Sequence, residues 1–388
     1  MAIMKYDFVV IGATGIQGRI VTRDLLLNNY SVILCGRDKS RVLDLLKKHK
    51  KKTSFAYLDL RDREKSISTI KNSGAKIVVN CAEGDFNLEA LKICIAANVH
   101  LIDLGSDIPM LREQLAMKNI LAKKGLIHIT GCGSVPGVGN VMMSYASQKF
   151  DIVSTVKVGF AWGSNMKVFV VPFSITSILK EFTADAPFLH NHKTMKIKPM
   201  NSISRIYHRA VGVENQFKVG HHPETYTFHK FLERKGIKNI EFYAGFPDHS
   251  MNVLLALVET GFASKVPLEI TGVKIIPASF IVELLKRIKM PKGYLEAENL
   301  WATLIGKHNG KVKEIHMECI VPPLKGWENS GCNIDTGMPA SIIAQMIYKK
   351  EITKPGAWSP EEIVPHNLFF NQLSIRHIHI YENKKKIS

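Results

Sequence analysis

The sequence predicts an α/β fold in which a doubly wound parallel sheet is combined with an inserted α+β domain that has a mixed sheet. Three observations support this class. Short apolar segments alternate with helix-like segments over residues 6–131, which is the pattern of right-handed βαβ crossovers. A glycine triplet stands where the first strand gives way to the first helix, in the stretch VVIGATGIQGRIV (Val9 to Val21). Beyond residue 150 the alternation ends and strand-like segments dominate.

The elements of the first domain follow from two periodicities. Runs of β-branched and other apolar residues predict strands over 6–11, 31–35, 55–60, 76–82, 100–105 and 126–131. Apolar residues at helical spacing predict helices over 15–28, 40–49, 62–73, 87–98 and 108–124. Helices of this length between strands imply parallel neighbours.

The rest of the chain predicts a second domain and a returning tail. Strands are expected over 156–162 and 240–246, and residues 299–321 predict a hairpin that turns at Asn309-Gly310, a dipeptide that favours tight turns between antiparallel strands. A final helix is expected over 338–348. We therefore expect a first domain over 1–135, an α+β substrate and dimerisation domain over 136–330, and a segment over 331–388 that packs back on the first domain.

The composition limits the partners. The 388 residues carry 52 Lys and Arg against 34 Asp and Glu, a net charge of +18. The densest basic run, KKHKKK, contains no aromatic residue, so we expect a small anionic substrate and no nucleic-acid partner. No apolar run approaches the roughly 20 residues that cross a bilayer, so no membrane span is expected. The six cysteines show neither disulfide nor metal spacing, which predicts a cytoplasmic protein without a metal site.

The glycine triplet predicts a dinucleotide site of the Rossmann type, because it follows a strand and opens a helix. Gly12 would make the turn, Gly15 would let a pyrophosphate approach the backbone, and Gly18 would let the helix lie close to the sheet. The helix N-terminus would add amide donors. The alternative is a tight turn that binds no ligand. The residues of this turn expected to bind the cofactor are Gly12, Thr14, Gly15, Ile16, Gln17 and Gly18.

The end of the second strand indicates NADP. NAD enzymes carry a carboxylate there for the ribose hydroxyls, whereas this chain has Gly36 followed by Arg37, with Arg41 close by. Guanidinium groups suit a 2′-phosphate, although Asp38 leaves NAD open. Ligands of parallel sheets bind beyond the carboxyl ends of the strands. Further cofactor contacts are therefore expected from Asp59, Leu60, Asn80, Cys81 and Ala82.

Several motifs follow one another along the chain: GATGIQG with LCGRD, then VVNCAEG, HLIDLGSD, GCGSVPGVGNVM, PFSITSILKEFTADAPFLHNHK and DTGMPASIIAQMI. In this order and spacing the chain resembles the saccharopine dehydrogenase-like family of nicotinamide-dependent oxidoreductases. The resemblance implies a Rossmann domain completed by the C-terminal segment, an inserted mixed-sheet domain, and redox chemistry at a carbon–nitrogen bond. Saccharopine-specific members resemble G-x-D-P-G where this chain has Val135 in place of the acid, which argues against saccharopine itself as the substrate.

The reaction needs few protein groups, because the cofactor supplies the hydride and the protein positions the substrate and handles one proton. The candidates for this role are Ser106 and Asp107, just past the fifth strand, and His222 in the second domain, which could equally be an ordinary histidine. We expect an NADP-dependent homodimeric oxidoreductase acting at a C–N bond of an amino-acid-derived substrate. Two alternatives stay open: reduction of a lipid-linked C=C bond, as by trans-acting enoyl reductases, and a non-catalytic NADPH-binding redox sensor.

Overall fold

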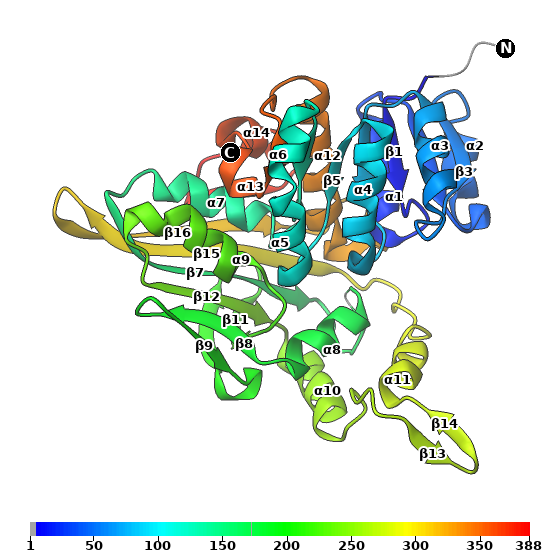
Figure 1. Cartoon of the computed structure of the whole chain (residues 1–388). Helices are drawn as coiled ribbons and strands as arrows, with labels where there is room; N and C mark the ends of the chain where they lie inside the picture. Colours follow the sequence, from blue (N-terminus) through cyan, green and yellow to red (C-terminus); the bar gives the residue numbers. More distant parts are fainter. Residues whose placement is uncertain (1–4, 172) are drawn as a thin grey trace. The chain divides into compact units, whose positions relative to one another are not determined.

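The computed structural model describes residues 5–171 and 173–388, which form two compact units (Figure 1). Unit 1 comprises the described residues up to Tyr145, Asn333–His379 and Ser388, and unit 2 comprises Ala146–Cys332 and Ile380–Ile387. The expected boundary at 135/136 thus lies inside unit 1. Residues 380–387, expected to pack on the first domain with the rest of 331–388, belong to unit 2 instead.

The sheet of unit 1 has seven strands in the order β17-β6-β5-β4-β1-β2-β3, and every neighbouring pair is parallel. This order confirms the predicted doubly wound sheet, and the chain reverses its winding between β1 and β4. The strands are β1 (Phe8–Ile11), β2 (Val32–Gly36), β3 (Thr53–Tyr57), β4 (Ile77–Asn80), β5 (His100–Asp103), β6 (Ile127–Ile129) and β17 (Gly356–Trp358).

Helices cover both faces of this sheet. Alternate strand residues point to opposite faces: Val9 and Val78 lie in an apolar cluster with Ile70 of α3, whereas the Phe8 ring lies 5.4 Å from the Tyr348 ring of α12. The helices of unit 1 are α1 (Ile16–Leu27), α2 (Leu43–Lys48), α3 (Arg63–Ser73), α4 (Asn87–Ala97), α5 (Ile108–Ala116), α6 (Lys118–Lys123), α7 (Val138–Ser147), α12 (Ile334–Tyr348), α13 (Pro360–Ile363) and α14 (His366–Ile375), with 3-10 helices at Lys39–Val42 and Gly84–Phe86.

Some local predictions differ from the structure, and one strand of unit 1 was not predicted. The helix expected over 108–124 is divided into α5 and α6 at Met117, and the strand expected over 55–60 ends at Tyr57, where its pairing with Gly36 of β2 ends. Strand β17 was not predicted. It has three residues and is stabilised by its parallel pairing with β6, which periodicity along the chain cannot reveal.

Unit 2 contains a ten-stranded mixed sheet whose main path is β10-β11-β12-β7-β15-β16-β18-β19, as the α+β prediction requires. Strands β12 and β7 are parallel, whereas β7 and β15 are antiparallel. The hairpin prediction is confirmed: Asn309 and Gly310 join β15 to β16, both with positive φ (50° and 77°). At the far edge, Asn383 N donates to His316 O at 2.8 Å, which explains why the last strands join this sheet.

The remaining elements complete unit 2. Its strands are β7 (Ile152–Ser164), β8 (Ala186–His190), β9 (Lys193–Ile197), β10 (Ser204–His208), β11 (Gly212–Lys218), β12 (Asn239–Gly245), β13 (Leu268–Ile270), β14 (Val273–Ile275), β15 (Glu296–His308), β16 (Lys311–Val321), β18 (His379–Glu382) and β19 (Lys385–Lys386). Its helices are α8 (Ile175–Thr183), α9 (Glu224–Leu232), α10 (Asp248–Glu259) and α11 (Pro277–Leu285), with 3-10 helices at Pro199–Asn201, Glu233–Lys235 and Glu328–Asn333. Among the described residues, no helix is both long and apolar enough to span a membrane.

A buried ionic network attaches the C-terminal segment to α1. The Asp24 carboxylate accepts two hydrogen bonds from the Arg376 guanidinium (2.7 and 2.9 Å), one from the Ser341 hydroxyl (2.6 Å) and one from the Gln345 amide (3.0 Å). Asp24 is 3% exposed and Arg376 8% exposed. Because each charge is paired and hydrogen-bonded, the network fixes α12 and the end of α14 against the helix that follows the glycine turn.

We predict that Asp24→Ala lowers the free energy of unfolding by about 3–5 kcal/mol, because it leaves the buried Arg376 charge without a partner. Urea denaturation of the purified protein measures this change. The control is Asp44→Ala, which removes the exposed ion pair with Arg19 and should cost less than about 1 kcal/mol. Equal losses in the free energy of unfolding would show that the buried Asp24 network stabilises the protein no more than the exposed Asp44–Arg19 ion pair does.

Candidate functional site

The glycine turn between β1 and α1 leaves no room for side chains at two of its three glycines. Gly12 has a φ of +72°, and a Cβ there would lie 2.7 Å from the Ala82 nitrogen. A Cβ on Gly18 would lie 2.2 Å from the Gly12 carbonyl oxygen. The turn therefore lies directly against the end of β4, and α1 lies directly against the turn, as predicted for Gly12 and Gly18.

Gly15 differs from these two glycines because its surroundings are open. It is the residue before α1, its φ of −87° suits any residue, and a Cβ there would meet only the Gly12 oxygen, at 3.4 Å. The first amides of α1 have no acceptor within the helix, and its first turn contains no acidic residue. An anion can therefore approach these amides, which fits a pyrophosphate group.

The next two residues of the turn face different surroundings. The Ile16 side chain is 54% exposed. The Gln17 amide nitrogen donates to the Asn333 side-chain oxygen at 3.0 Å, so this side chain connects the turn to the beginning of α12. Any contact of Ile16 and Gln17 with the cofactor would consequently come from their backbone amides. Both contacts remain predictions.

The end of β2 fits a 2′-phosphate. A Cβ on Gly36 would lie 2.9 Å from the Thr14 methyl group, so the Thr14 side chain leaves little room for a carboxylate side chain at position 36. The Asp38 carboxylate accepts hydrogen bonds from the Ser40 amide (2.9 Å) and hydroxyl (2.6 Å), and these bonds lower its pKa. Within the described residues, the exposed Arg37 and Arg41 side chains make no hydrogen bond or ion pair. Both guanidinium groups are available to a phosphate.

Asp59 and Leu60, expected to contact the cofactor beyond β3, have other partners. The Asp59 carboxylate forms a bidentate pair with Arg61 (2.9 and 2.5 Å), and the Arg61 hydrogen bonds lower the Asp59 pKa to about 2. Leu60 is 5% exposed and belongs to the core of unit 1. The role of Asp59 and Leu60 in cofactor binding stays a prediction. It requires that NADP can bind while the Asp59–Arg61 pair and the packing of Leu60 are kept.

The last residue of β4 and the two residues after it lie next to the glycine turn. The Asn80 amide is buried; it donates to the Asn87 side-chain oxygen at 2.8 Å, and its own oxygen accepts from the Ala82 amide at 3.2 Å. Asn80 thus holds the Cys81–Ala82 peptide against Gly12. Burial raises the pKa of the Cys81 thiol, which keeps it neutral.

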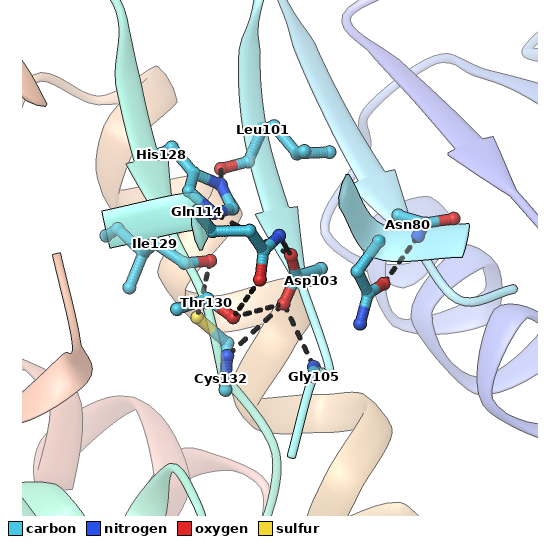
Figure 2. Close-up of polar contacts among 11 residues, drawn as sticks. Asn80, Leu101, Asp103, Gly105, Gln114, His128, Ile129, Thr130 and Cys132 are labelled. Atoms are coloured by element: carbon cyan, nitrogen blue, oxygen red, sulfur yellow. Dashed lines mark hydrogen bonds and ion pairs between the residues drawn. The ribbon is translucent and has the colours of Figure 1, made fainter. Parts of the chain in front are cut away.

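A second buried network surrounds Asp103 (Figure 2). It was not among the predicted site residues. The Asp103 carboxylate accepts from the Gly105 amide (2.9 Å), the Thr130 hydroxyl (2.8 Å) and the Gln114 amide (2.7 Å). His128 lies 3.7 Å away, and burial lowers its pKa. The network joins the loops after β5 and β6 at the carboxyl edge of the sheet. An acid inside the apolar segment HLIDLG was the available signal.

The loop that this network holds carries Ser106 and Asp107. Both are partly exposed, and the Asp107 carboxylate accepts a hydrogen bond from the Met110 amide at 3.1 Å, which caps α5. A capping carboxylate keeps lone pairs for other donors. The two residues are thus placed beyond the carboxyl end of β5, and their catalytic role remains a prediction.

His222, the third candidate, lies in unit 2 in a buried cluster. Its imidazole ring stacks on Phe242 with ring centroids 3.5 Å apart. Its Nε2 lies 3.6 Å from the Glu181 carboxylate and its Nδ1 lies 3.6 Å from that of Glu224. Burial opposes the charge of the ring, but the two carboxylates close to its nitrogens outweigh this effect and raise the His222 pKa to about 9. The ring is therefore an imidazolium at neutral pH.

Comparison with known proteins decides the family. Residues 8–129 match the saccharopine dehydrogenase NADP binding domain, and residues 117–378 match the saccharopine dehydrogenase C-terminal domain. The chain belongs to the saccharopine dehydrogenase family. NADP is accordingly the cofactor, which confirms the cofactor prediction. The open space at Gly15 and the Arg37 side chain, which makes no hydrogen bond or ion pair within the described residues, are consistent with NADP.

Individual relatives agree with this assignment. The chain is 22% identical over 381 residues to carboxyaminopropylagmatine dehydrogenase of Synechocystis, with 92% of each protein covered. It is 22% identical over 376 residues to carboxynorspermidine synthase of Vibrio cholerae, covering 92% of this chain and 90% of that protein. The fold is that of the L-Glu-forming saccharopine dehydrogenase of Saccharomyces cerevisiae, with a TM-score of 0.77 at 12% identity over 99% of this chain and 100% of the other.

The family and the fold together define an NADP-dependent oxidoreductase of the saccharopine dehydrogenase type. Both relatives are named as enzymes, which confirms the prediction of a dehydrogenase or reductase.

We predict that two substitutions weaken cofactor binding in different ways. Gly15→Ala places a methyl group where the pyrophosphate approaches, so NADPH and NADH should both bind more weakly. Arg37→Gln removes one charged contact to the 2′-phosphate, worth about 1.5–3 kcal/mol, so only NADPH affinity should fall, about ten- to a hundredfold. Calorimetric titration of each variant with both dinucleotides measures these affinities.

The matched control for Arg37→Gln is Lys47→Gln, which removes an exposed charge on α2. Both site variants should keep their free energy of unfolding to within about 1 kcal/mol of the parent protein. Unchanged NADPH affinity in a folded Arg37→Gln protein would show that another group binds the 2′-phosphate.

Proposed function

We propose that this enzyme joins an amine to a carbonyl compound by reducing the imine that forms between them. In that reaction the amine nitrogen attacks the carbonyl carbon, and one proton is taken up as water leaves and a protonated imine forms. The imine carbon then receives a hydride, which gives a secondary amine. NADPH supplies the hydride when bound and becomes NADP. The main support for the proposal is that two relatives whose names contain carboxylated amines align over nine-tenths of this chain.

The chain's own residues have limited tasks in this proposal. The turn at Gly12 and Gly15 holds the pyrophosphate, and Arg37 with Arg41 holds the 2′-phosphate. Ser106 and Asp107 are the proposed proton-handling pair beyond β5, positioned by the Asp103 network. The Asp107 Oδ1 atom accepts the bond from the Met110 amide, and the remaining lone pairs of the carboxylate can accept a proton.

The substrate is proposed to carry both a carboxylate and amino groups. The names of both relatives contain a carboxy group and an amine, and the basic chain favours capture of an anion.

Among the described residues all six cysteines are free, which supports the proposed cytoplasmic location.

We predict NADP reduction when the purified enzyme is given carboxynorspermidine or carboxyaminopropylagmatine, and little or none with saccharopine. The physical reason is that hydride transfer at the C–N bond is reversible, so the secondary amine is a substrate in the oxidative direction. Absorbance of NADPH follows the reaction. Retained NADPH binding without turnover in either direction would instead support the sensor, and reduction of an unsaturated lipid would support the enoyl reductase alternative.

We further propose a homodimer. Apolar side chains between α10 and β15 are exposed in unit 2, as large apolar patches often are at interfaces: Val266, Leu268, Ile270, Val273, Phe280 and Leu284. Light scattering during size-exclusion chromatography should give twice the chain mass of 43.5 kDa. A mass equal to that of one chain would contradict the proposal.

A further inference from the structure

The cluster of Glu181, His222 and Glu224 contains more negative than positive charge. Glu181 comes from α8, Glu224 is the first residue of α9, and His222 lies on the loop that precedes α9. The Gly220 amide donates to the Glu181 carbonyl oxygen at 3.3 Å, which attaches this loop to α8. Two carboxylates therefore face one imidazolium, so the ionised cluster carries a net charge of −1.

The carboxylates of this cluster lack the partners that buried acids normally have. The Glu224 side chain is 0% exposed and the Glu181 side chain 10% exposed. Both Glu224 oxygens and the Glu181 Oε2 atom are buried without a hydrogen bond, and within the part of the chain described no Lys or Arg pairs with either residue. The N-terminus of α9 favours the Glu224 charge but does not replace hydrogen bonds.

Two other buried acids of this chain, Asp24 and Asp103, differ from this arrangement because donors surround them. Asp24 is paired with Arg376 and accepts four hydrogen bonds, and Asp103 accepts bonds from several donors. Both are complete without a ligand. Unpaired buried carboxylates cost several kcal/mol, so a protein retains them where another cation completes the site.

We infer that the Glu181–His222–Glu224 cluster binds a cationic nitrogen group of the substrate, such as an alkylammonium or guanidinium group. This inference rests on the proposed function, which supplies an amine substrate. An added cation would neutralise the cluster, and its N–H donors would satisfy the unpaired carboxylate oxygens. His222 acts here as a positioning residue: its ring, stacked on Phe242, lies between the two carboxylates and contacts both of them.

The inference predicts that the enzyme distinguishes a diamine from a monoamine of the same length. Putrescine has a second ammonium group for the cluster, whereas butylamine has none. Calorimetric titration of the full-length protein should show putrescine binding at least about tenfold tighter than butylamine. Glu224→Gln and Glu181→Gln should each weaken putrescine binding by about ten- to a hundredfold and leave butylamine unchanged.

The control is Glu233→Gln, which changes an exposed acid just beyond α9 and should bind putrescine like the parent protein. Equal binding of the two amines by the parent protein would overturn the inference even if neither cluster variant folds. So would a preference for putrescine that survives in both folded variants, which would show that the cluster is structural.

The two proposals fail separately, because amine binding is measured without turnover. Tight putrescine binding that depends on Glu224, together with no NADPH oxidation, would contradict only the proposed reaction. Turnover of amines with equal KM for putrescine and butylamine, unaffected by Glu224→Gln, would contradict only the cation site.

Discussion

The proposed cofactor site depends on the close contact of three backbone segments at the amino end of α1. Gly12 lies against the Cys81–Ala82 peptide and Gly18 lies against Gly12, in both cases without space for a Cβ atom. This contact places the amide-rich beginning of α1 at the point where the sheet reverses its winding, beyond the carboxyl ends of β1 and β4. Gly15 alone remains open, so the same turn combines tight packing on one side with access for a phosphate on the other.

Buried acids divide into two groups that carry different information. Asp24 and Asp103 are surrounded by donors, and they hold the C-terminal helices and the two loops beyond β5 and β6 in place. Glu181 and Glu224 are as deeply buried but have one shared partner, His222. Since burial of charge is costly unless it is compensated, the complete networks stabilise the fold, whereas the unsatisfied oxygens of Glu181 and Glu224 support the proposed cation site.

The overall charge and the local charge point to different parts of one substrate. A net charge of +18 attracts anions over a distance, although salt screens that attraction beyond about 10 Å. The buried acidic cluster of unit 2 acts at contact distance and selects a cation. A substrate with a carboxylate and an amino group satisfies both, which a net charge taken from composition could not reveal.

Features that are local in the chain could be predicted from the sequence: the alternation of strands and helices, the glycine turn, Arg37 in place of a carboxylate, and the Asn309-Gly310 hairpin. Each depends on neighbouring residues, so periodicity and turn chemistry were sufficient to predict it. Contacts between distant segments became known from the fold alone: the pairing of β17 with β6, the Asp24–Arg376 pair, the Asp103 network and the partners of His222. These contacts join residues far apart in the chain, and whether a buried charge is satisfied depends on which donors the fold brings to it.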